Sequence, residues 1–63
     1  MEEKEKLLYV RTVMERLCCS KNYVYALIQS GQLEAYRIGS HLRVIEKSVD
    51  DFLAKRKVVV GEN

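Results

Sequence analysis

The sequence predicts one small α+β domain, mostly helical, with three helices and a β-hairpin. Apolar residues recur at helical spacing in three separate segments, three residues separate the first two predicted helices, and an alternating segment with a central glycine precedes the third. With 63 residues the chain has room for one small core, since a domain of this size buries only about 60% of the surface of its unfolded form. The balance of 48% hydrophobic and 32% charged residues excludes a disordered tail.

The segment before the first helix is dominated by charge. Five of the first six residues are charged, so we expect residues 1–7 to form a flexible lead-in. The first helix is then predicted by an apolar stripe at spacing i, i+3, i+4 and i+7, which comprises Val10, Val13, Met14 and Leu17. Arg11 and Arg16 are interpreted as surface residues that aid solubility.

The second helix repeats part of that stripe with Val24, Leu27 and Ile28. Ser20 is suited to cap its N-terminus, and Gly31 stands where a residue in the left-handed conformation would end it. Residues 18–20 alone separate the last apolar residue of the first helix from the start of the second. Two helices joined by so short a turn form a helix-turn-helix unit.

Residues 35–45 predict a β-hairpin whose tip is Gly39-Ser40-His41. A three-residue loop keeps apolar residues together on one face and pairs Ile38 with Leu42, Tyr36 with Val44, and Arg37 with Arg43. Like charges directly opposite one another destabilise a strand pair. The predicted arginine pair therefore indicates a hairpin that binds an anion.

The third helix is predicted by apolar residues at spacing i, i+4, i+7 and i+8, namely Ile45, Val49, Phe52 and Leu53. Asp50 and Asp51 lie towards its start and basic residues 55–57 at its end, which suits the helix dipole. The predicted domain spans residues 8–55, and residues 56–63 are expected to form a C-terminal tail.

The residues offer little for catalysis or metal binding. His41 is the one histidine, and spacing places no carboxylate or nucleophile beside it, so an enzyme is not expected. Cys18 and Cys19 are adjacent, which suits neither a disulfide framework nor, with His41, a four-ligand zinc site. We interpret both as small packing residues and expect no cofactor and no metal.

No apolar run approaches the about 20 residues of a membrane span, and no signal peptide opens the chain. We therefore expect a cytoplasmic protein without a membrane partner. From Leu7 to Ile45 the basic residues exceed the acidic ones by three, whereas residues 46–63 are balanced. The basic excess belongs to the helix-turn-helix and the hairpin, the two elements that would approach a polyanion such as DNA.

Four side chains of the second helix point away from the predicted core and suit the major groove of DNA: Lys21, Asn22, Tyr23 and Tyr25. The corresponding set on the hairpin suits the backbone or the minor groove and comprises Arg37, Ser40, His41 and Arg43. On spacing alone an alternative stays open, in which these are a solvated helix start and an exposed hairpin with ordinary surface charges.

Residues 19–33 (CSKNYVYALIQSGQL) resemble the "VSRSTVYRLIRSGKL" stretch of the excisionase-type, MerR-like DNA-binding domains. Residues 35–44 (AYRIGSHLRV) resemble the "AYRVGRHLRI" wing of that family, and residues 48–53 are similar to its closing "DLEAFL". The resemblance implies a winged helix-turn-helix with the second helix in the major groove and the wing along the minor groove. It implies DNA contacts at Ser20, Lys21, Asn22, Tyr25, Arg37 and Arg43.

The sequence departs from that family pattern at four positions. Tyr9 stands where Thr usually caps the first helix, and Cys18 replaces the usual glycine of the turn, which must then avoid positive φ or accept strain. Ala26 replaces an arginine, which removes a phosphate contact, and Ile45 replaces a proline at the start of the last helix.

The resemblance implies an excisionase-like recombination directionality factor. Such a protein catalyses nothing: several copies bind neighbouring sites, bend the DNA and let a separate integrase assemble. The expected partners are double-stranded DNA and an integrase, and the expected location is the nucleoid. The protein is expected to be a monomer in solution, with cooperative assembly on DNA an option. A small transcriptional regulator on the same fold and a protein-interaction module both remain as alternatives.

Overall fold

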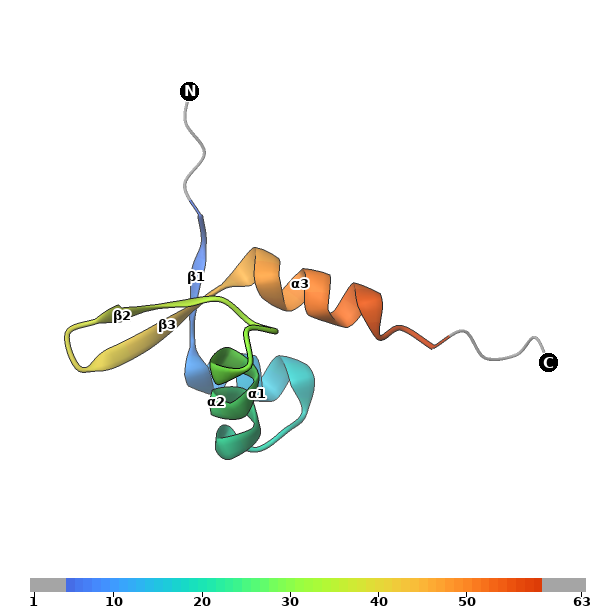
Figure 1. The fold of residues 1–63 in the computed structure, drawn as a ribbon, viewed down its shortest axis with the longest axis horizontal. Coiled ribbons are helices and arrows are strands. Elements are labelled where there is room, and N and C mark those ends of the chain that lie inside the picture. Colours follow the sequence, from blue (N-terminus) through green and yellow to red (C-terminus); the bar gives the residue numbers. More distant parts are fainter. Residues whose placement is uncertain (1–4, 59–63) are drawn as a thin grey trace, which may run out of the picture.

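A computed structural model describes residues 5–58, which form six elements. In chain order these are β1 (Leu7–Tyr9), α1 (Val10–Leu17), α2 (Lys21–Gln29), β2 (Ala35–Ile38), β3 (His41–Ile45) and α3 (Glu46–Lys55). The fold class is confirmed, because three helices accompany an antiparallel sheet with a projecting hairpin, the wing. In Figure 1 the wing of β2 and β3 extends to one side of the α1–α2 pair and α3 extends to the other. None of the helices within residues 5–58 is long and apolar enough to cross a membrane.

The sheet has one more strand than the sequence predicted. Its order is β1-β3-β2, and β1 pairs Leu8 with Val44. Leu7, inside the segment predicted to be a flexible lead-in, lies opposite Ile45 in this strand. Three residues are too few to show a period of two, and the partner strand lies more than 30 residues away in the chain. The predicted behaviour of residues 1–4 and 59–63 lies outside the described residues.

The predicted register of the wing is wrong. Its loop has two residues, Gly39 and Ser40, and the strand pairs are Ala35 with Val44, Tyr36 with Arg43, Arg37 with Leu42, and Ile38 with His41. The fully buried Val44 pairs with Ala35, whose side chain is small. Gly39 has a φ of 63°, as the first loop residue of a type II′ turn requires. Arg37 and Arg43 therefore lie on opposite faces of the wing and do not repel one another across it.

Eight buried apolar side chains from β1, the three helices, β3 and the loop after α2 form the core: Leu8, Val13, Val24, Leu27, Leu33, Val44, Val49 and Phe52. The predicted stripes of α1 and α2 are confirmed. On α3 the prediction is wrong for Leu53, whose side chain is 42% exposed. In Figure 1 helix α3 extends away from the α1–α2 pair and from the wing.

Helix α2 is capped at both ends as predicted. The Ser20 hydroxyl accepts the backbone N–H of Tyr23 at 3.2 Å. At the other end Gly31 has a φ of 84° and donates its N–H to the Ile28 carbonyl at 3.2 Å, and the next N–H bonds to the Leu27 carbonyl at 2.9 Å. These two bonds form a Schellman motif, which satisfies carbonyls that the helix end leaves free.

Helix α1 has different ends. Tyr9 occupies the N-cap position without a side-chain capping bond, and Cys18 ends the helix with a left-handed φ of 54°. The turn has accepted the strain that replacement of its usual glycine implies. Cys18 is exposed, so its predicted packing role is wrong; Cys19 is half-buried against the core. Burial and the neighbouring Cys18 raise the pKa of the Cys19 thiol.

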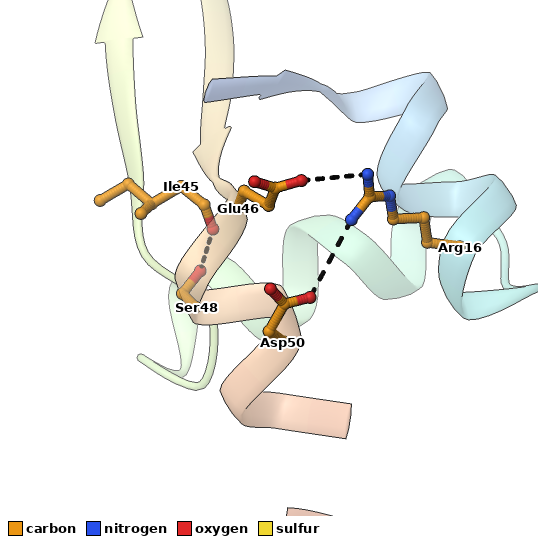
Figure 2. A network of polar contacts seen from close by, with 5 residues as sticks. All are labelled: Arg16, Ile45, Glu46, Ser48 and Asp50. Carbon is orange, nitrogen blue, oxygen red and sulfur yellow. Dashed lines mark hydrogen bonds and ion pairs between the residues drawn. The ribbon is translucent and has the colours of Figure 1, made fainter. Parts of the chain in front are cut away.

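A polar network joins α1 to the start of α3 (Figure 2). The Arg16 guanidinium lies 3.1 Å from Glu46 and 4.0 Å from Asp50, so the arginine interpreted as a solubility residue links two helices. The Ser48 hydroxyl donates to the Ile45 carbonyl at 2.7 Å. Half-exposed ion pairs contribute about 1 kcal/mol or less, so the network orients α3 more than it stabilises the fold.

Candidate nucleic-acid interface

A groove runs between the wing and the helix pair. Its walls come from α1, α2 and the wing, and its charged side chains are all basic: Arg11, Lys21, Arg37 and Arg43. Among the described residues that line it, none is acidic. Six of the nine predicted DNA-contact residues meet here: Lys21, Tyr25, Arg37, Ser40, His41 and Arg43.

One face of α2 forms the helical wall. Lys21, Tyr25 and Gln29 follow at intervals of four residues and therefore lie on one side of the helix. The Lys21 ammonium lies 6.0 Å from the centre of the Tyr25 ring, at the limit for a cation–π contact. Sequence reasoning missed Gln29, although its position eight residues after Lys21 predicts the same face.

The other predicted residues of α2 lie at its N-terminus outside the groove. The Ser20 hydroxyl is occupied by capping. Asn22 and Tyr23 are exposed on faces that do not line the groove. Their position in the first turn is where recognition helices present side chains to base edges.

The wing supplies two arginines in different environments. Arg37 is exposed opposite Leu42, on the face that carries Val44. Arg43 is half-buried, with its guanidinium carbon 4.5 Å from the centre of the Tyr9 ring and Nη1 donating to the Leu42 carbonyl at 3.0 Å.

Tyr36 faces Arg43 from β2, and its hydroxyl donates to a Glu5 carboxylate oxygen at 2.8 Å. That hydrogen bond and the charge of Glu5 raise the pKa of the Tyr36 phenol. Glu5 thus lies near the wing without lining the groove.

The groove cations are not neutralised by the carboxylates described. Within residues 5–58 the ion pairs join Arg16 to Glu46 and Asp50, and Lys47 to Asp51. All of these lie on α1 and α3 away from the groove. Clustered cations without opposing carboxylates produce a positive potential that attracts a polyanion.

Residues 7–57 match a family model described as a helix-turn-helix domain, which covers most of the chain. The chain belongs to this helix-turn-helix domain family. The match confirms the helix-turn-helix unit that the short turn between the first two helices predicts. No three His, Cys, Asp or Glu side chains gather as metal ligands in the part of the chain that the structure describes.

Two relatives of this helix-turn-helix protein come from Mycobacterium tuberculosis, one from strain CDC 1551 / Oshkosh and one from strain ATCC 25618 / H37Rv. Both carry the name "Putative DNA-binding protein", and each is 40% identical over 52 residues, which cover 82% of this chain and 67% of the relative. No solved structure gives a significant match.

Sequence reasoning also missed the α1 side of the groove, which includes Tyr9, Arg11 and Thr12. The missed strand β1 explains this, because its pairing with β3 places the start of α1 next to the wing. Arg11 extends the basic lining beyond the predicted contact set.

Proposed function

We propose that this helix-turn-helix protein binds double-stranded DNA, with α2 in the major groove and the wing at the adjacent minor groove and backbone. The observation that carries this proposal is the groove between α2 and the wing, which has four cations and no acidic residue among its described lining side chains. The names of the two mycobacterial relatives agree with it.

On the helix, Asn22 lies in the first turn and suits bidentate pairing with adenine. Lys21 reaches a phosphate or the acceptor edge of guanine, and Tyr25 bonds a phosphate or packs on a thymine methyl group. Tyr23 lies next to Asn22 and is 49% exposed, so it can contact the wall of the same DNA major groove. The cap at Ser20 fixes the direction in which this first turn points.

On the wing, Arg37 and Arg43 neutralise phosphates or enter the minor groove, where its negative potential favours arginine. Ser40 and His41 lie at the tip of the hairpin and contact the backbone there. Arg11 adds a phosphate contact from α1. These cations release condensed counterions from DNA, which makes the affinity depend steeply on salt.

The biological role we propose is that of an excisionase-like recombination directionality factor. The resemblance of residues 19–33 and 35–44 to excisionase-type domains supports this role. The protein would catalyse nothing; copies on neighbouring sites would bend the DNA for an integrase. Bending costs of order 1–6 kcal/mol, which the added contacts offset. A transcriptional regulator would use the same interface.

Fluorescence anisotropy over a salt series tests DNA binding, with a duplex of about 25 base pairs and the intact chain. We expect log affinity to fall linearly with log salt, and Lys21→Ala and Arg37→Ala each to reduce the slope by about one. Lys47→Ala is the matched control, because this lysine is 81% exposed on α3 and pairs with Asp51. Wild-type protein that shows no binding at low salt would refute the proposal.

Capture of fragmented genomic DNA from the source organism by the purified protein separates the two biological roles. Sequencing of the bound fragments should recover clustered sites beside an integrase gene and its attachment site. Sites at promoters without a neighbouring integrase would instead assign the protein as a transcriptional regulator.

A further inference from the structure

Tyr9 combines three features that a helix-starting residue does not need. It stands at the N-cap position of α1 but makes no side-chain capping bond. Its side chain is 62% exposed, and it lines the basic groove. Its strand partner is Arg43, whose guanidinium lies over its ring.

We propose that Tyr9 is a positioning residue for DNA binding, which holds the Arg43 guanidinium in the groove in the orientation that binds a phosphate. This inference rests on the proposed DNA binding. It assigns a role to a residue outside the predicted contact set and at a position where this chain departs from the excisionase-type pattern.

The geometry fixes Arg43 from two sides. The guanidinium carbon lies over the ring of Tyr9, 4.5 Å from its centre, and Nη1 donates to the Leu42 carbonyl at 3.0 Å. Nη2 and Nε keep donors for a ligand. An arginine held in place loses less side-chain entropy on binding than a free one, so its phosphate contact is stronger.

A purely structural role does not account for Tyr9. An aromatic side chain that is 62% exposed contributes little to the core. Ser, Thr, Asp and Asn are the residues that stabilise an N-cap, so tyrosine leaves the start of α1 less stable than Thr would. Positions that break a local preference are where functional constraints concentrate.

A double-mutant cycle measured by the same salt-series anisotropy tests the proposal. Tyr9→Ala should weaken DNA affinity about three- to fivefold, the size of an exposed cation–π contact, and leave the salt slope unchanged because the cation remains. Arg43→Ala should reduce the slope by about one. In the Arg43→Ala background, Tyr9→Ala should have almost no further effect.

Three further variants separate positioning from folding. Tyr9→Phe keeps the ring and should bind like wild type. Tyr9→Thr supplies a capping side chain and should bind as weakly as Tyr9→Ala while its thermal midpoint, followed by circular dichroism, equals or exceeds that of Tyr9→Ala. Tyr36→Ala is the matched control, because Tyr36 faces Arg43 from the other neighbouring strand but donates its hydroxyl to Glu5.

Equal losses from Tyr9→Ala in the wild-type and Arg43→Ala backgrounds would overturn the proposal. The proposal would also be overturned if Tyr9→Ala bound DNA with wild-type affinity. It would be overturned as well if the loss of affinity in Tyr36→Ala coupled to Arg43 as strongly as the loss in Tyr9→Ala does. In each of these cases wild-type protein still binds DNA, so the proposed function stands. Absence of wild-type binding at low salt would instead refute both.

Discussion

Helices α1 and α2 have eight and nine residues, and their ends are built differently. The Ser20 hydroxyl caps the start of α2, and Gly31 ends it in the left-handed conformation that glycine adopts without steric cost. Helix α1 starts at Tyr9 without a side-chain cap and ends at Cys18, whose Cβ makes the same conformation unfavourable.

The difference separates local from tertiary stabilisation. Helix α2 has in its own sequence the groups that satisfy its ends, so the first turn that presents Asn22 has a defined geometry. Helix α1 depends on tertiary packing through the buried Val13, and the half-exposed ion pair from Arg16 to α3 adds about 1 kcal/mol or less. Substitutions at the ends of the two helices should therefore affect stability in different directions.

The largest effect is expected where the loop after α2 enters the core. Leu33 is 1% exposed, and Leu33→Ala should lower the free energy of unfolding by about 2–5 kcal/mol. Total stability for this length is of order 3–9 kcal/mol, so the loss is a large fraction of it and should lower the urea midpoint strongly. Leu17→Ala, at the half-buried end of α1, should cost clearly less in urea titrations followed by circular dichroism. Equal losses would contradict the contrast between the two helix ends.

The next effect concerns the left-handed residue of α2. Gly31→Ala should cost about 1–2 kcal/mol in the free energy of unfolding, because alanine disfavours positive φ. A Cβ at this position would meet no atom within 4 Å, so the cost is conformational and not steric. Gly31→Asn, which tolerates this conformation better, should recover part of the loss in the same titration. If the asparagine and alanine variants lose the same stability, the conformational explanation fails.

The N-cap of α2 should contribute about 1 kcal/mol. Ser20→Ala removes the acceptor for the Tyr23 N–H, whereas Ser20→Gly should cost only a few tenths of a kcal/mol. Because the cap orients the proposed recognition turn, Ser20→Ala should also weaken DNA affinity more than its loss of stability explains. Anisotropy and thermal unfolding, compared for both variants, check this. If folded Ser20→Ala binds DNA with unchanged affinity, the cap stabilises the fold but does not contribute to DNA binding.

The features of α2 could be predicted because they are local. The cap at Ser20, the glycine end at Gly31 and the buried stripe of Val24 and Leu27 depend on residues within one helix length. The resemblance to excisionase-type domains predicted the same helix and the position of the wing.

The features that sequence reasoning missed are non-local. Strand β1 forms because Leu8 pairs with Val44 far along the chain, and this pairing decides which face of β3 is buried. The register of the wing follows from that face and from the Gly39 turn, not from matching apolar residues across two strands. The stacking of Arg43 on Tyr9 required both strands to be placed, so no spacing rule within either segment could reveal it.

The smallest effect should have the opposite sign, at the end of α1. Cys18→Gly removes the strain of a Cβ at φ 54° and gives the unfolded chain more freedom, so the net gain should be about 0.5–1 kcal/mol. Cys18→Ala is the control, because it keeps a Cβ and removes only the weak thiol contact to the Glu15 carbonyl at 3.7 Å. If Cys18→Gly melts above the wild type and Cys18→Ala melts at the same temperature as the wild type, the gain in stability comes from the backbone conformation. If both variants gain equally, the thiol itself destabilises the turn, and the left-handed conformation of Cys18 costs the fold little.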